Sequence, residues 1–133
     1  MVLMRKSFKT RETRYCASVK KILAEHGHAT NHELLDGLRS DYPALSATTV
    51  HRVTARLAHR GEIGLAPNTL GGELRYDANN RPHDHFRCMH CDGLRDMQAA
   101  DRLLPLLSLE GCIVSGPFVI SGLCQKCIKK KEV

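Results

Sequence analysis

Two Cys-x-x-Cys pairs constrain this chain of 133 residues more than any other feature. The first pair is Cys88 and Cys91, and the second is Cys124 and Cys127. Each pair can place two thiolates on one tetrahedral zinc ion, and four thiolates leave no open position, so such a site is structural. The intervening residues 92–123 are too many for a compact zinc ribbon, so an α+β element has to fit between the pairs. Disulfides or redox dithiols are the alternative, which a reducing compartment disfavours.

The sequence predicts a cytoplasmic protein with no membrane partner. No stretch approaches the roughly 18 consecutive apolar residues of a membrane span, and residues 1–9 carry charges without the apolar core of a signal peptide. Of the remaining cysteines, Cys16 and Cys112 are expected in the core rather than as reactive thiols.

Basic residues are concentrated in the first half of the chain. Residues 1–60 hold eleven Lys and Arg against five Asp and Glu, so the whole net charge of +6 lies there. A basic half joined to a neutral half that carries most of the cysteines suggests a nucleic-acid-binding module linked to a metal-binding module. An ordinary solvated basic surface is the other interpretation.

The first half has the periodicity of three helices. An amphipathic helix is predicted over about Arg11–His26. Thr30 and Glu33 have the spacing of a capping box for a short second helix. Ser46 is a suitable N-cap for a third helix over about Ala47–Arg60. The outward face of this third helix is basic.

Two short strands are then predicted at Ile63–Ala66 and Glu73–Tyr76. Three helices and a β-hairpin describe a winged helix-turn-helix, whose last helix enters the major groove of double-stranded DNA. A structural three-helix bundle has the same periodicity, and the basic third helix favours DNA binding over it. The candidate DNA-contacting residues are Thr48, Thr49, His51, Arg52, Arg56, Lys20 and Lys21.

The polar, proline-ended segment 78–82 is interpreted as a hinge. It separates a winged-helix domain, residues 1–77, from a small α+β domain, residues 83–133. The overall fold class is therefore α+β. In the second domain, strands are expected near His85–Met89, Leu94–Met97 and Val119–Gly122, with a helix near Ala99–Glu110 in which Pro105 causes a kink or lies near the start.

A second candidate metal site surrounds His83 and His85. Residues i and i+2 of a strand point to the same side, so these two imidazoles can share one ion. Asp77, Asp96 and His28 offer further ligands. Such a mixed set suits Mn²⁺, Fe²⁺ or Zn²⁺ in five- or sixfold coordination. A His-x-His pattern by itself is weak, because such residues more often lie on surfaces or in hinges.

The segments His83–Cys91, Cys124–Cys127 and Thr48–Arg52 together resemble the ferric uptake regulator family over roughly residues 11–128. Members of that family are dimeric winged-helix repressors that bind DNA when their regulatory ion is present. The resemblance therefore implies a homodimer, an inverted-repeat DNA operator, and a second domain that dimerises. It implies control of metal-homeostasis or peroxide-stress genes.

The peroxide-responsive and manganese- or iron-sensing branch of the family uses three histidines and two aspartates for sensing. By resemblance, the regulatory ligands of this chain are His28, Asp77, His83, His85 and Asp96. Zinc uptake regulators, the alternative branch, often have a cysteine near the position of Asp77. This chain has no cysteine there, which disfavours that branch. If the ion is iron, the resemblance implies that peroxide oxidises His28 or His83.

The chain departs from the family pattern at three places. His51 stands where a tyrosine is usual in the third helix, so the DNA sequence that is read is expected to differ. Arg11–Arg14 replaces a Thr-Pro-Gln-Arg motif. The histidine and glutamate that often precede the second cysteine pair are missing, so no third metal site is expected.

Two other functions stay open from the sequence. Histidines with carboxylates also describe an open iron or hydrolytic zinc centre of an enzyme. No nucleophile or supporting acid motif accompanies them, so neither catalysis nor a small-molecule substrate is expected. The other is a zinc-stabilised metal buffer or interaction module without DNA binding, whose function would survive replacement of Arg52 and Arg56 by alanine.

Overall fold

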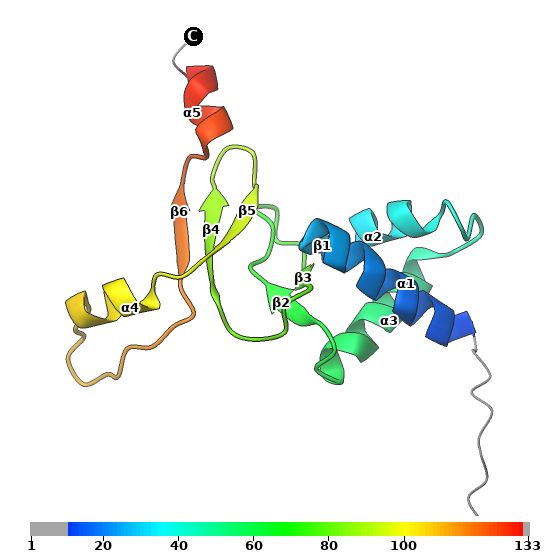
Figure 1. Cartoon of the computed structure of the whole chain (residues 1–133), viewed down its shortest axis with the longest axis horizontal. Coiled ribbons are helices and arrows are strands. Elements are labelled where there is room, and N and C mark those ends of the chain that lie inside the picture. The colour runs from blue at the N-terminus through cyan, green and yellow to red at the C-terminus, as the bar shows by residue number, and fades with distance from the viewer. Residues whose placement is uncertain (1–10, 132–133) are drawn as a thin grey trace, which may run out of the picture. The chain divides into compact units, whose positions relative to one another are not determined.

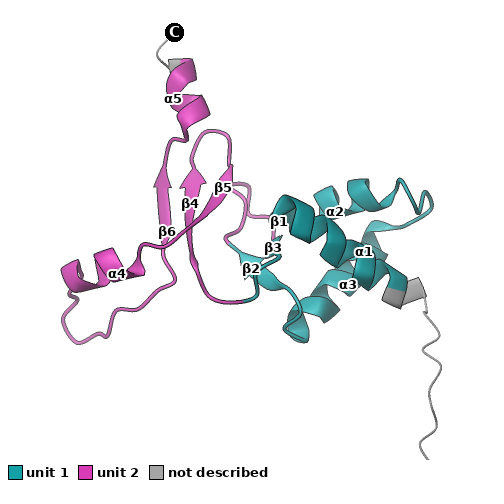
Figure 2. Cartoon of the chain, in the orientation of Figure 1, with its two compact units in different colours: residues 1–66, 75–80 teal, residues 67–74, 81–133 magenta. Residues whose placement is uncertain are grey.

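The computed structural model of the chain describes residues 11–131 (Figure 1). These residues form two compact units (Figure 2). Unit 1 runs as far as Ala66 and includes Arg75–Asn80, whereas unit 2 comprises Pro67–Leu74 and the chain from Arg81 onward. Both units contain helices and strands. The α+β class predicted from the sequence is therefore confirmed.

Three helices build most of unit 1. Helix α1 spans Arg11–His26, α2 spans Asn31–Leu38 and α3 spans Ala47–His59. The predicted capping box is present at the start of α2, because the Thr30 hydroxyl accepts a hydrogen bond from the Glu33 amide and the Glu33 carboxylate accepts one from the Thr30 amide. Local sequence signals thus place these helices to within a residue.

The helices of unit 1 enclose an apolar core. Its most buried members, each at most 2% exposed, are Val19, Leu23, Ala29, Leu34, Leu38, Val50, Val53 and Leu57. Burial of one such valine or leucine side chain contributes about 1.5–3 kcal/mol. Side-chain packing therefore holds this unit together, and the opposite face of α3 can carry charge.

A small antiparallel sheet completes unit 1. Strands β1 (His28–Thr30), β2 (Gly64–Ala66) and β3 (Arg75–Asp77) lie in the order β1-β3-β2. The register pairs His28 with Asp77 across β1 and β3. The β2–β3 hairpin is the predicted one, whereas β1 is too short for its alternation to be recognised in the sequence.

Unit 2 is built on a mixed three-stranded sheet. Strands β4 (Asp84–Cys88), β5 (Leu94–Met97) and β6 (Val119–Gly122) lie in the order β5-β4-β6. β4 is antiparallel to β5 and parallel to β6. The parallel pairing brings the carboxyl ends of β4 and β6 to the same edge, where each cysteine pair begins (Figure 1).

The helical content of unit 2 differs from the prediction. Helix α4 covers only Ala100–Leu103 and is followed by a 3₁₀ turn, Leu104–Leu106. The predicted helix Ala99–Glu110 is therefore too long, because Pro105 has no N–H with which to continue α-helical hydrogen bonding. Helix α5, Gln125–Lys131, was not predicted.

The two cysteines outside the Cys-x-x-Cys pairs differ in environment. Cys16 packs against the core of unit 1, as expected. Cys112 is exposed, so its expected place in a core was wrong. It follows Gly111, which has a φ of 76°, in an irregular segment and not at the start of a strand.

Within residues 11–131, no helix is long and apolar enough to cross a membrane. Residues 1–10 and 132–133, which the predicted domain ranges include, lie outside the described part of the chain, as does the N-terminal segment inspected for a signal peptide.

Candidate metal centres and DNA-binding face

The four paired cysteines come together in unit 2. Cys88 ends β4 and lies opposite Gly122 of β6, two residues before Cys124. One sulfur atom from each of Cys88, Cys91, Cys124 and Cys127 lies within 4.8 Å of the others. The two Cys-x-x-Cys segments, Cys88–Cys91 and Cys124–Cys127, are called the first and second knuckles. They meet because β4 and β6 run side by side in the same direction.

The spacing of these sulfur atoms fits zinc and does not fit a disulfide. The Cys91 and Cys124 sulfurs are 3.7 Å apart. Four thiolates at about 2.3 Å from a tetrahedral zinc ion are about 3.8 Å from one another, whereas disulfide sulfurs are about 2.05 Å apart. No disulfide joins any of the six cysteines, all of which lie in the described part of the chain. A Cβ atom on Gly93 would lie 3.2 Å from the Cys91 sulfur, so glycine lets the loop approach closely.

Main-chain amides surround the Cys88 sulfur. It accepts hydrogen bonds from the amides of Cys91 at 3.5 Å and Cys124 at 3.4 Å. These donors lower the pKa of the Cys88 thiol to about 5. Burial raises the pKa of the Cys127 thiol to about 12. Because zinc ligands are thiolates, Cys127 has to release a proton when zinc binds.

A second cluster of ligand atoms lies in unit 2, earlier along β4. His85 pairs with Asp96 across β4 and β5. The Nε2 atoms of His83 and His85 lie 3.1 Å and 3.3 Å from the same Asp96 oxygen, Oδ1. Nδ1 of His83 lies 2.7 Å from the Arg81 carbonyl oxygen. Donation to that oxygen leaves Nε2 with its lone pair available to a metal.

Three ligand atoms do not complete a coordination shell. Mn²⁺, Fe²⁺ and Zn²⁺ take four to six ligands. The set His83, His85 and Asp96 therefore fits such an ion but leaves positions open. Asp96 is also the exposed member, with 55% of its side chain accessible.

Two further candidate ligands of the same types meet in unit 1. His28 Nε2 lies 3.5 Å from Asp77 Oδ2 across β1 and β3. Asp77 is only 1% exposed, and its other oxygen accepts a hydrogen bond from the Asn79 amide at 2.9 Å. A histidine and a buried carboxylate are thus held rigidly by the sheet of unit 1.

Asp84 is a residue whose importance the sequence analysis missed. Its side chain accepts hydrogen bonds from the amides of Phe118 at 2.8 Å, Ala99 at 2.8 Å and Ala100 at 2.9 Å. These hydrogen bonds hold the pKa of the Asp84 carboxyl below its usual value, and the bond from Phe118 has the largest effect. Strand alternation was the available signal, because the residue between the two histidines has to face the other side of β4. Asp84 thereby connects β4 to the starts of α4 and β6.

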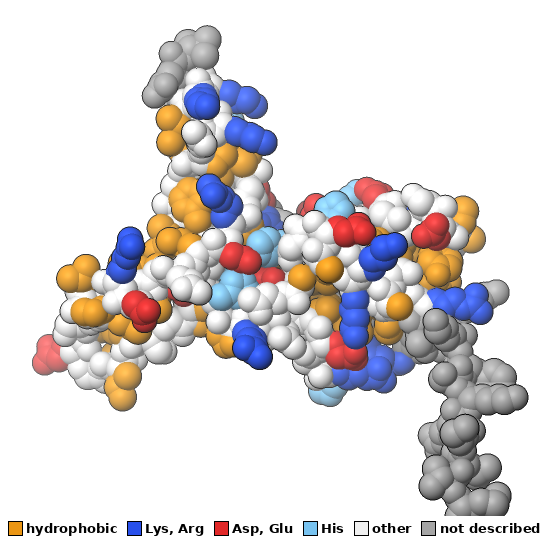
Figure 3. Space-filling view, viewed as in Figure 1, with side chains coloured by type: hydrophobic (Ala, Val, Ile, Leu, Met, Phe, Trp, Pro, Cys, Tyr) orange, Lys and Arg blue, Asp and Glu red, His pale blue; other side chains and the backbone are white. Residues whose placement is uncertain are grey.

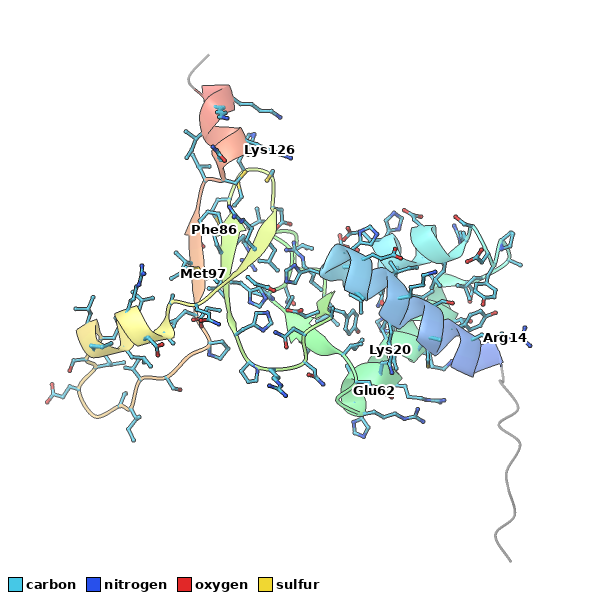
Figure 4. All side chains as sticks on the ribbon, viewed as in Figure 1. Arg14, Lys20, Glu62, Phe86, Met97 and Lys126 are labelled. Atoms are coloured by element: carbon cyan, nitrogen blue, oxygen red, sulfur yellow. The ribbon has the colours of Figure 1, made fainter. Side chains whose placement is uncertain are left out.

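The outer face of α3 is basic and exposed. In Figure 3, Lys and Arg side chains gather over the edge of unit 1 near α3. The predicted contact residues that are exposed are Thr48, His51, Arg52, Arg56, Lys20 and Lys21, whereas Thr49 is half-buried. Lys20 forms an ion pair with Glu62, at 2.6 Å (Figure 4), which lowers the pKa of the Glu62 carboxyl.

The side chain of His51 is held in place on α3. The Asn31 amide nitrogen lies 2.9 Å from His51 Nδ1, and the Asn31 oxygen accepts a hydrogen bond from the Thr54 hydroxyl at 2.8 Å. When Nδ1 accepts in this way, the imidazole proton is on Nε2. His51, which is unusual at its position, is therefore oriented by the half-buried Asn31.

Comparison with known proteins accounts for the fold. The sequence pattern of the ferric uptake regulator family matches residues 7–103. The chain belongs to the ferric uptake regulator family. Its members are transcriptional regulators, and its solved structures combine a winged-helix DNA-binding domain with a dimerisation domain. The resemblance and the fold predicted from the sequence are confirmed.

Several relatives within the family are similar along most of the chain. The peroxide-responsive repressor PerR of Staphylococcus aureus is 25% identical over 121 residues, which cover 86% of this chain and 79% of that protein. The crystal structure of the Campylobacter jejuni peroxide stress regulator has a TM-score of 0.68 at 26% identity, covering 96% of this chain and all of that one. A zinc uptake regulator complexed with zinc and DNA shares the fold, with a TM-score of 0.59 at 18% identity over 95% of this chain and 89% of that one.

Proposed function

We propose that this chain is a metal-dependent, DNA-binding transcriptional repressor of metal-homeostasis or peroxide-stress genes. The observation that carries the proposal is the convergence of His83, His85 and Asp96 beside a four-cysteine cluster in a member of this family. A closed site of four thiolates suits a permanent ion, and an open site of imidazole and carboxylate suits an exchangeable one.

Structural zinc is assigned to Cys88, Cys91, Cys124 and Cys127. A zinc ion there would cross-link the end of β4 to the segment that follows β6. The 2.9 Å hydrogen bond from the Cys88 amide to the Gly93 carbonyl already closes the first knuckle. Zinc then stabilises unit 2, whose described helices are short.

The regulatory ion, Fe²⁺, Mn²⁺ or Zn²⁺, is assigned to ligands from both units. His83, His85 and Asp96 of unit 2 would leave coordination positions open, and we infer that His28 and Asp77 of unit 1 fill them. Simultaneous binding by both units would favour the conformations that bring their ligands together. Differential affinity of about 3 kcal/mol is enough to change such populations more than a hundredfold.

DNA binding is assigned to the exposed face of α3. Arg52 and Arg56 lie on that face, and His51 presents its Nε2–H outward from the hydrogen bond with Asn31. An N–H donor suits base-edge acceptors such as guanine O6 and N7. Lys20 would exchange its ion pair with Glu62 for a phosphate contact.

A homodimer on an inverted repeat follows from the same assignment, because two symmetric recognition helices read two half-sites. Unit 2 exposes large apolar side chains that a dimer interface would cover. They are Leu106 at 79%, Leu109 at 62% and Ile113 at 98% exposed. Apolar side chains grouped in this way mark protein interaction surfaces.

The test is a fluorescence anisotropy titration of zinc-replete protein against a DNA fragment from its own promoter, first in chelator and then anaerobically with Mn²⁺, Fe²⁺ or Zn²⁺. We expect binding only with a regulatory ion and a steep dependence on salt. Binding should disappear in the Arg52→Ala, Arg56→Ala protein, which still holds its zinc. A folded, metal-loaded protein that shows no salt-sensitive DNA binding would instead be a metal buffer or an interaction module.

The titration also separates the branches of the family. A response to zinc alone would indicate a zinc uptake regulator. If the iron-loaded protein loses DNA binding permanently after exposure to peroxide, mass spectrometry should find one added oxygen atom on the peptide with His28 or His83. The similarity to the peroxide-responsive repressor PerR of Staphylococcus aureus supports testing Fe²⁺ first.

A further inference from the structure

The loop of the β2–β3 hairpin forms hydrogen bonds with two residues of unit 2, Arg87 and Asp92. The loop, Pro67–Leu74, belongs to unit 2, whereas the two strands that it joins belong to unit 1 (Figure 2). The Leu70 amide donates a hydrogen bond to Asp92 Oδ2 at 2.9 Å. The Arg87 guanidinium donates one to the Asn68 carbonyl oxygen. The hairpin therefore passes from one unit into the other at its tip.

Both partners of the loop flank the first cysteine pair. Arg87 directly precedes Cys88, and Asp92 directly follows Cys91. Asp92 has a φ of 62°, and its amide donates to the Cys88 carbonyl at 3.0 Å. Aspartate tolerates this left-handed conformation better than most residues. The fold of the knuckle thus sets the direction of the carboxylate that holds the loop.

The loop also has hydrogen bonds within itself. The Gly72 amide donates to the Thr69 carbonyl, and the Thr69 amide donates to the Glu73 carbonyl, both at 2.9 Å. The Thr69 hydroxyl accepts from the Glu73 amide at 2.9 Å. Gly72 has a φ of 90°, which glycine adopts without strain. The turn therefore presents a fixed carbonyl at Asn68 and a fixed N–H at Leu70.

The charge of the loop does not suit contact with DNA. Residues 67–74 contain no Lys or Arg, and their only charged side chain is Glu73. A wing that follows the phosphate backbone gains affinity from basic residues. The loop offers none, and it repels phosphate at Glu73.

We propose that this hairpin loop is a strut braced on the zinc knuckle, with Arg87 and Asp92 as its positioning residues. It is not a DNA-contacting wing. The proposal rests on the assignment of zinc to the four cysteines and not on DNA binding. Folding of the knuckle would then hold the tip of the hairpin.

Hydrogen exchange of the full-length, zinc-loaded protein tests the strut directly. Asp92→Gly removes the acceptor while keeping a residue that adopts positive φ. Asp92→Asn is the matched control, because it keeps an acceptor oxygen and the left-handed preference but weakens the bond by removing its charge. We expect the Leu70 amide to exchange about tenfold faster or more in Asp92→Gly, with an intermediate rate in Asp92→Asn. The Gly72 amide, bonded within the loop, should not change.

Zinc content is measured on every sample, because Asp92 adjoins a cysteine ligand. Unchanged Leu70 exchange in both variants would overturn the strut. If Asp92→Gly loses zinc, the zinc-loaded Asp92→Asn protein decides: faster exchange at Leu70 alone supports the strut, and wild-type exchange refutes it. This readout needs no DNA, so it remains valid if the repressor function fails.

A charge-reversal variant supplies an independent check. If the loop followed the phosphate backbone, Glu73→Lys would steepen the slope of log affinity against log salt by about 0.9. The strut predicts a wild-type slope. A steeper slope would show that the loop contacts DNA and would contradict the proposal.

Discussion

The two candidate metal sites of this protein differ in where their ligands come from. The four-cysteine cluster lies wholly within unit 2, and the sulfur atoms of Cys88 and Cys91 accept main-chain hydrogen bonds. The proposed His and Asp ligands are divided, with three in unit 2 and two in unit 1. A site complete within one unit stabilises that unit. A site whose ligands are shared by two units can instead report metal binding as a change in how those units are arranged.

Ligand chemistry follows the same division. Thiolates select zinc and, in a closed tetrahedron, leave no position for exchange. Imidazole and carboxylate ligands bind several divalent ions and allow exchange with solvent. The exposure of Asp96 and the burial of Cys88 agree with this difference.

The largest effect is expected from removing a cysteine ligand. Cys88→Ser should lose zinc and with it the cooperative folding of unit 2, because Cys88 is fully buried and connects both knuckles. Zinc analysis and hydrogen exchange of the amides in β4, β5 and β6 measure this. Cys112→Ser is the matched control and should keep its zinc, since Cys112 is exposed and outside the cluster. Retention of zinc by Cys88→Ser would show that the four-cysteine assignment is wrong.

Removal of a regulatory ligand in unit 2 should leave the zinc in place. We expect His85→Ala to lower Mn²⁺ affinity by about a hundredfold or more in calorimetric titrations, because even an outer-shell change costs 10- to 100-fold. His90→Ala, an exposed histidine between the first two cysteines, should bind Mn²⁺ normally. Equal affinities in the two variants would count against a regulatory site on β4.

Removal of a ligand in unit 1 should weaken Mn²⁺ binding less than removal of one in unit 2. It should nevertheless abolish the effect of Mn²⁺ on DNA binding. We expect His28→Ala to weaken Mn²⁺ binding by about tenfold, because the ligands of unit 2 remain. The rise in DNA affinity on adding Mn²⁺ should nevertheless disappear. Anisotropy titrations at saturating Mn²⁺ measure it, and a normal rise in His28→Ala would mean that the ion does not join the two units.

The smallest effect is expected on the other face of β4. Asp84→Asn places an amide among three main-chain N–H donors, so the thermal transition of unit 2 should fall by several degrees while zinc content stays the same. Asp101→Asn, at an exposed position in α4, is the control. Identical transition temperatures would show that Asp84 does not hold the sheet to α4 and β6.

Features encoded by neighbouring residues were predictable from the sequence. Helix α2 was placed by the capping box of Thr30 and Glu33, and α3 by its N-cap Ser46. The cysteine spacing identified the cluster that the β4 and β6 pairing assembles. In each of these cases the signal lies within a few residues of the feature.

Features that depend on distant contacts were not predictable. Strand β1 forms because β3 pairs with it, and the three amides that bind Asp84 come from two later segments. Nothing local marks Leu70 as a partner of Asp92. The exposure of Cys112 likewise depends on the absence of a strand in its irregular segment.

The most direct test of the divided site is to count the histidine nitrogens bound to Mn²⁺ by pulsed electron paramagnetic resonance, in zinc-replete protein. The account predicts three imidazole ligands in the wild type and two in His28→Ala. Two imidazoles in the wild type, with no change in His28→Ala, would confine the ion to unit 2 and contradict the claim that both units hold it.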